Sequence, residues 1–183
     1  SFRIVDDAMS LDAVGEAVTE TRPGPEIGIV FALTKGDRPE LVVQKLTELG
    51  VDHLWPVVSE RTVVRWDASK AVKQHERLTK VIREAAMQSR AVFIPRLHPV
   101  QASLRDAVAA VGDAAVALAE PGGVPVSAGV SVVIIGPEGG FTAEELETVD
   151  VKMSLPGGIL RAETAAIAAG VLLAENRRRG TES

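Results

Sequence analysis

The stretch IIGPEGGFT, from Ile134 to Thr142, indicates the fold class of this chain of 183 residues. It opens with the end of an uncharged, β-branched run that predicts a buried strand. A turn of glycine and proline leads into a predicted helix. Thr142 caps this helix, and Glu145, three residues later, completes a capping box. Ligands of open α/β sheets bind beyond the carboxyl ends of strands, so this turn is a candidate ligand site. A tight structural turn would also explain it, and neither a phosphate-loop lysine nor a Gly-x-Gly-x-x-Gly pattern is present.

A second turn of this kind lies in LPGGILRAETA, from Leu155 to Ala165. It follows a strand predicted at 152–155 and enters an alanine-rich helix predicted at 161–178. Glu163 suits the positive end of the helix dipole, whereas Arg161 in the first turn does not. The unfavourable position of Arg161 indicates another task for it, although a loop followed by a helix start would also explain the segment.

Strands and helices alternate along the rest of the chain. Short apolar runs predict strands at 27–33, 53–58, 93–95, 114–119 and 130–135. Helical spacing and capping residues predict helices at 37–49, 68–90 and 103–111. This alternation predicts an α/β fold with a mostly parallel sheet flanked by helices.

Composition excludes several classes of protein. The 46% hydrophobic and 25% charged residues fit a globular domain. Cysteine is absent, which excludes a disulfide framework, a cysteine zinc site and a thiol nucleophile. No run of 18 uncharged apolar residues occurs, so we expect no membrane span. The three histidines lack metal-ligand spacing, so we expect no metal.

The net charge of −5 conceals a basic stretch. Residues 61–105 hold ten basic and three acidic side chains, which gives +7 against −12 for the remainder. The stretch could therefore supply a local footprint for RNA phosphates, although the whole chain is acidic.

Several motifs, in their order and spacing, resemble the ribosomal RNA small subunit methyltransferase E family of the SPOUT class. They are KGD at 35–37, VVQKLTELG at 42–50, SER at 59–61, QSR at 88–90, IGPEGGF at 135–141, and ILR with ETA within 159–165. Family members usually carry glycine and arginine where this chain has Pro156 and Gly158, and threonine where it has Ala162.

The resemblance implies an enzyme that methylates N3 of a specific uridine in small-subunit (16S) ribosomal RNA, with S-adenosylmethionine as cofactor. It also implies a deep trefoil knot at the C-terminal side, a homodimer and a cytoplasmic location. The partner would be small-subunit ribosomal RNA or the assembled small subunit. Two alternatives stay open: a non-catalytic RNA-binding protein of the same fold, and a nucleotide-binding enzyme of ordinary doubly wound topology.

The resemblance further implies site residues and domains. The expected cofactor-binding residues are Leu118, Ala119, Glu120, Ile135, Gly136, Pro137, Gly139, Gly140, Leu155, Pro156, Gly157, Ile159, Leu160, Arg161 and Thr164. The expected catalytic residues are Arg161, Glu163, Arg61 and Arg90. The expected RNA-binding residues are Lys35, Lys45, Arg61, Arg65, Gln88 and Arg90. Residues 1–25 would be a remnant of an N-terminal PUA-like β-barrel, and residues 26–183 the SPOUT methyltransferase domain.

Overall fold

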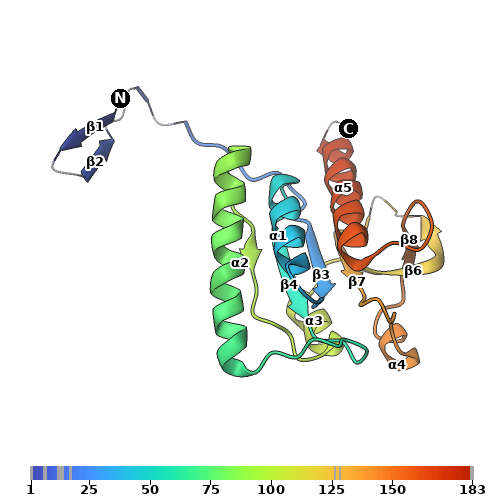
Figure 1. Ribbon diagram of the computed structural model, residues 1–183. Helices are drawn as coiled ribbons and strands as arrows, with labels where there is room; N and C mark the ends of the chain where they lie inside the picture. Colours follow the sequence, from blue (N-terminus) through green and yellow to red (C-terminus); the bar gives the residue numbers. More distant parts are fainter. Residues whose placement is uncertain are drawn as a thin grey trace.

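The computed structural model describes residues 2–5, 8–11, 15–16, 18–125, 127 and 129–181. Its body is a six-stranded sheet in the order β5-β4-β3-β7-β6-β8, with parallel neighbours throughout (Figure 1). The strands are β3 (Gly28–Ala32), β4 (His53–Val57), β5 (Arg96–Leu97), β6 (Val116–Pro125), β7 (Val132–Ile135) and β8 (Lys152–Ser154). The helices are α1 (Arg38–Glu48), α2 (Ala68–Ser89), α3 (Leu104–Val111), α4 (Ala143–Leu146) and α5 (Ala162–Thr181). The predicted α/β architecture with a mostly parallel, helix-flanked sheet is confirmed.

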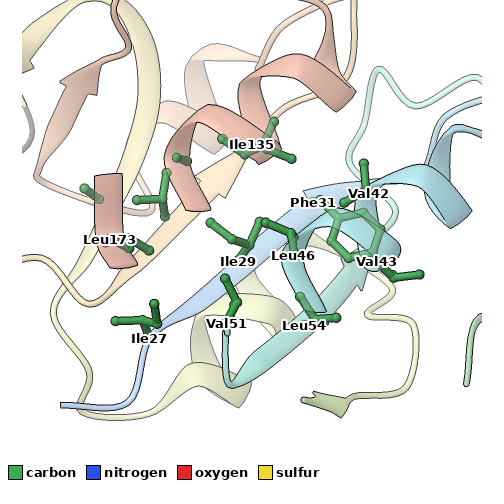
Figure 2. Close-up of a cluster of buried hydrophobic side chains, with 14 of the residues drawn as sticks. Ile27, Ile29, Phe31, Val42, Val43, Leu46, Val51, Leu54, Ile135 and Leu173 are labelled. Carbon is green, nitrogen blue, oxygen red and sulfur yellow. The ribbon is translucent and has the colours of Figure 1, made fainter. Parts of the chain in front are cut away.

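Both faces of the sheet are buried. Ile29 and Phe31 of β3 pack in a cluster with residues of α1, α2 and α5, which Figure 2 shows in part. Val30 and Ala32 belong to a second cluster, which includes residues of α3. Every residue of β3 is buried, as expected for a central strand of a parallel sheet with helices on both sides.

Small side chains let α5 pack closely against α1. Ala166 and Ala169 are fully buried. A Cβ atom added to Gly170 would lie only 2.5 Å from the Cδ2 atom of Leu46. The alanine-rich composition of this helix therefore serves its packing on the rest of the domain.

Two strands differ from the prediction. The strand predicted at 93–95 is wrong, since β5 comprises Arg96–Leu97. Pro95 has no N–H group to donate to a neighbouring strand, so regular pairing begins after it. β6 continues beyond its predicted end to Pro125, because it resumes pairing with β8 after a register shift.

Two further strands precede the sheet. β1 (Phe2–Val5) pairs antiparallel with β2 (Ala8–Leu11), and Figure 1 shows the pair apart from the six-stranded sheet. Residues 1, 6–7, 12–14 and 17 of the expected N-terminal remnant lie outside the described residues.

Asp52 connects three segments at the amino edge of the sheet. The residue is 4% exposed, and its carboxylate accepts a hydrogen bond from the Ile27 amide at 2.9 Å. It also forms ion pairs with Arg22 and, at 2.7 Å, with Arg177 of α5. Arg177 donates a second hydrogen bond to the Gly50 carbonyl at 2.8 Å. The buried carboxylate thus holds the segment before β3 and the C-terminal helix to the start of β4.

Replacing Asp52 by alanine should lower the free energy of unfolding by about 2 kcal/mol, because the Ile27 amide and the Arg177 guanidinium lose their acceptor. The cost stays at this level because Arg22 is partly exposed. Urea unfolding at neutral pH measures the change. The control is Glu48→Ala, which removes an exposed pair with Lys45 and should cost less than about 0.5 kcal/mol. Equal losses in the two variants would contradict the assignment.

Candidate functional site

A cavity of about 550 Å³ opens at the carboxyl ends of β7 and β8 and beside the middle of β6, where residues 119–122 lie at its register shift. The three strands are neighbours in the sheet, so the segments that follow β7 and β8 meet this part of β6 at one edge. The lining comes from residues 119–122, 135–141 and 154–160 except Pro156, with Ala162 and Ala165 of α5. Both Gly/Pro turns singled out in the sequence therefore form walls of one cavity.

The lining of the cavity is apolar and acidic. Its ionisable side chains are Glu120 and Glu138, and no lysine or arginine of the described residues lines it. Phe141 and the leucines and isoleucine of the 155–160 segment supply apolar surface, and Ile159 is 96% exposed. A lining of this kind favours an organic ligand with a net positive charge and disfavours phosphate groups.

The turn after β7 has a defined backbone shape. Gly140 has φ of +69°, a conformation that side chains disfavour, and its amide donates to the Pro137 carbonyl at 2.9 Å. The predicted capping box is confirmed. The Glu145 amide donates to the Thr142 hydroxyl at 3.3 Å, and the Thr142 amide donates to the Glu145 carboxylate at 3.0 Å. The turn is therefore fixed on its C-terminal side by the start of α4.

The loop after β4 supports the same turn. Arg61 donates from Nη1 to the carbonyl of Gly139 at 3.0 Å. The Glu60 amide donates to Oε1 of Glu145 at 2.9 Å, and Glu145 is only 5% exposed. Arg61 thus lies against the outside of a cavity wall and does not itself line the cavity.

Eleven of the fifteen expected cofactor-binding residues line the cavity. Leu118, Pro156, Arg161 and Thr164 do not; Leu118 is fully buried in the core. Pro121, at the strand end expected to form one wall, also lines the cavity. Sequence reasoning left out the following lining residues: Gly122, Glu138, Phe141, Ser154, Gly158, Ala162 and Ala165. The two glycines after Pro121 were the available signal for the first of these.

The expected catalytic residues do not all lie together. Arg161 is exposed and precedes α5, at the cavity edge of the sheet. Glu163 lies in the first turn of α5, with its side chain 12% exposed. Arg90 caps the C-terminal end of α2, near the amino edge of the sheet, where β4 and β5 begin. The cavity lies at the other, carboxyl edge of the sheet. Arg38, which sequence reasoning missed, contacts Glu163.

The expected RNA-binding residues divide between the two edges of the sheet. Lys35 and Arg65 are exposed in the segments that follow β3 and β4, on the cavity side. Lys45 of α1 pairs with Glu48 at 2.9 Å. Gln88 lies with Arg90 at the far end of α2, which at 22 residues is about 33 Å long.

The histidines lie outside the cavity lining. His53 Nδ1 and His98 Nε2 are 3.0 Å apart, and both rings stack on Trp55. Burial, with the nearby charges of His53 and Arg96, lowers the pKa of His98 to about 4.

Within the described ranges, no group of three or more histidines and carboxylates could hold a metal ion. No helix in that part of the chain has the length and apolar character to cross a bilayer.

Comparison with known proteins shows which family this chain resembles. The model of the RNA methyltransferase domain matches residues 21–174. The chain is 34% identical to ribosomal RNA small subunit methyltransferase E of Bacillus subtilis over 82% of its own length and 66% of the relative's. It is 33% identical to the protein of that name from Mycobacterium bovis, over 79% of this chain and 61% of the relative.

A solved structure shares the fold. It is ribosomal RNA small subunit methyltransferase E from Neisseria gonorrhoeae bound to S-adenosyl methionine, with a TM-score of 0.73 and 29% identity. The similarity covers 81% of this chain and 65% of that one. This chain therefore spans roughly three fifths to two thirds of the length of its relatives.

Proposed function

Because this chain belongs to the ribosomal RNA small subunit methyltransferase E family, we propose that it methylates N3 of a specific uridine in 16S ribosomal RNA with S-adenosylmethionine. The observation that carries the proposal is that both Gly/Pro turns line the same cavity. Those two turns contain the family motifs IGPEGGF and ILR-x-ETA.

The chemistry of the cavity supports S-adenosylmethionine as its ligand. This molecule carries a sulfonium and an ammonium group against one carboxylate, so its net charge is positive. Glu120 would attract it and would repel the phosphates of ATP or NAD, whereas the charge of Glu138 is balanced by an ion pair with Arg38. The apolar segment 155–160 suits the adenine ring, and the glycines of the 136–140 turn permit close approach of the backbone.

In our proposed reaction, the bound cofactor supplies a methyl group for in-line displacement. Uracil N3 gives its proton to a base, and its electron pair forms the new N–CH3 bond. The S–CH3 bond breaks, and its electron pair stays on sulfur. Glu163 is the candidate base: it does not itself line the cavity but lies between Ala162 and Ala165, which do, and its Oε2 atom has no hydrogen-bond partner among the described residues. Arg161 is the candidate cation for the negative charge that spreads onto the uracil oxygens.

Arg61 and Arg90 have weaker geometric support as catalytic groups. Arg61 is engaged with the Gly139 carbonyl, so we propose that it holds the cavity wall beside the RNA. The cavity of the same chain lies at the opposite edge of the sheet from Arg90. Arg90 would therefore act only at the cavity of a second copy, as a homodimer would allow.

The basic stretch supports RNA as the substrate. Lys35 and Arg65 are exposed on the cavity side. On α2, Lys70, Lys73 and Arg83 are exposed and have no carboxylate partner among the described residues. We propose that these residues bind phosphates. Uracil N3 is paired in a duplex, so the target nucleotide must be unpaired or flipped.

The family resemblance supports three further proposals. The C-terminal part of the domain forms a deep trefoil knot, the protein works as a homodimer, and its location is cytoplasmic. A fourth proposal concerns the domains: residues 1–25 would be a remnant of an N-terminal PUA-like β-barrel, and residues 26–183 the SPOUT methyltransferase domain. The antiparallel β1–β2 pair outside the main sheet supports this division.

Transfer of a labelled methyl group tests the proposed function. We expect label from S-adenosylmethionine in small ribosomal subunits or their RNA, and we expect the modified base to be N3-methyluridine. Thermal shifts with S-adenosylhomocysteine, ATP and NAD identify the ligand class. Stabilisation by S-adenosylhomocysteine without label would support the non-catalytic alternative. Stabilisation by ATP or NAD alone would overturn the proposed cofactor.

A further inference from the structure

One arginine joins three segments at the edge of the cavity. Arg38 is the first residue of α1, and its guanidinium forms an ion pair with Glu138 in the turn after β7. Its Nε atom lies 3.8 Å from Oε1 of Glu163 in the first turn of α5. The guanidinium has five N–H donors in a planar fork, so it can contact two carboxylates at once.

The position of Arg38 is unfavourable for the helix that it begins. A cation at a helix N-terminus opposes the helix dipole. Asp37, the residue before it, makes no capping hydrogen bond with its side chain. Helix stability therefore does not explain an arginine here, whereas the two carboxylates that it contacts do.

The two carboxylates differ in their surroundings. Glu138 lines the cavity, and its side chain is 50% exposed. The Glu163 side chain is 12% exposed, and its Oε2 atom is buried without a hydrogen-bond partner among the described residues. Buried carboxylate oxygens in proteins normally accept hydrogen bonds. Oε2 of Glu163 can therefore still accept a hydrogen bond from a donor. In the proposed reaction, the N3–H group of uracil is that donor.

We propose that Arg38 is a positioning residue for methyl transfer: it holds Glu163 in the orientation that accepts the N3 proton and holds Glu138 at the cavity wall. This inference rests on the proposed function. The proton passes from N3 to Glu163, the N3 electron pair forms the N–CH3 bond, and the electron pair of the S–CH3 bond stays on sulfur. Arg38 gains and loses no proton. Without its cation, the two carboxylates repel each other and Glu163 loses its orientation.

A double-mutant cycle on kcat tests this role. Arg38→Gln should lower kcat at least about tenfold in the otherwise unchanged chain, and less than about twofold when Glu163→Gln is already present. Arg38→Lys should recover part of the loss, because an ammonium keeps the charge but lacks the planar fork. The control is Arg178→Gln, which removes an exposed pair with Glu175 far along α5. Thermal unfolding of each variant checks that the fold is kept.

The outcomes separate this inference from the proposed function. If Arg38→Gln has the same kcat as the Arg178→Gln control, the positioning role is overturned. Activity of the unchanged chain would still uphold the proposed function in that case. Losses from Arg38→Gln and Glu163→Gln that simply multiply would also overturn it, since Arg38 would then not act through Glu163. An unchanged chain that transfers no methyl group would overturn the proposed function and this inference together.

Discussion

Valine in place of Gly140 should lower the affinity for S-adenosylmethionine by more than about a hundredfold, because it disturbs the backbone that forms a cavity wall. Gly140 has φ of +69°, which a β-branched residue adopts only under strain. Relief of the strain would break the hydrogen bond from the Gly140 amide to the Pro137 carbonyl. The 136–140 turn would then lose the shape that lines the cavity. Calorimetric titration of the variant with S-adenosylmethionine measures the effect.

Gly112 offers a matched control for this substitution. Its φ is +74°, and nothing lies within 4 Å of a Cβ atom added there. It follows α3 and precedes β6, at the end of that strand away from the cavity. Both valine variants should therefore lose about 1–3 kcal/mol of stability from backbone strain. Equal cofactor affinities in the two variants would show that the shape of the 136–140 turn is not needed for binding.

The sequence was sufficient to predict the walls of the cavity because each wall is local in the chain. Glycine and proline after a β-branched run signal a turn at the end of a strand, and Thr142 with Glu145 signals the helix that follows. Parallel pairing then brings such turns to one edge of the sheet. These signals depend on near neighbours in sequence, and they predicted the two Gly/Pro turns. The fifteen expected cofactor-binding residues followed from the family resemblance, and eleven of them line the cavity.

The contacts between distant segments could not be predicted in this way. Arg38 meets Glu138 across 100 positions and Glu163 across 125, so no periodicity or spacing links them. The motif at 88–90 indicated a role near the substrate for Arg90, but α2 carries that residue to the opposite edge. The direction and length of a helix, which are tertiary properties, decide where its end lies.

The position of Pro95 shows a smaller effect of the same kind. The apolar residues at 93–95 have strand-forming character, yet pairing begins only at Arg96. Hydrogen bonding decides this boundary, because proline has no amide proton to donate and Arg96 donates to the Asp52 carbonyl at 2.8 Å. Hydrophobicity alone does not contain that information.

Arg161→Ala should lower kcat by about 10²- to 10³-fold, which is the usual cost of removing one group that stabilises developing negative charge. The affinity for S-adenosylmethionine should change by less than about threefold, since Arg161 does not line the cavity. No carboxylate of the described residues pairs with Arg161, so its exposed guanidinium is available to the uracil oxygens. Single-turnover methyl transfer, measured beside cofactor titration, separates the two quantities.

Arg161→Lys and Arg178→Ala complete this experiment. The lysine variant keeps a charge at the same place, so its rate should lie between those of the unchanged chain and of Arg161→Ala. Arg178 pairs with Glu175 near the other end of α5, and its removal should leave the rate of methyl transfer unchanged. An unchanged rate in Arg161→Ala would remove this arginine from the mechanism. A loss of cofactor affinity equal to the loss of rate would instead make it a cofactor-binding residue. Only a rate that falls while affinity persists assigns its charge to the transition state, because such an interaction forms after the cofactor is bound.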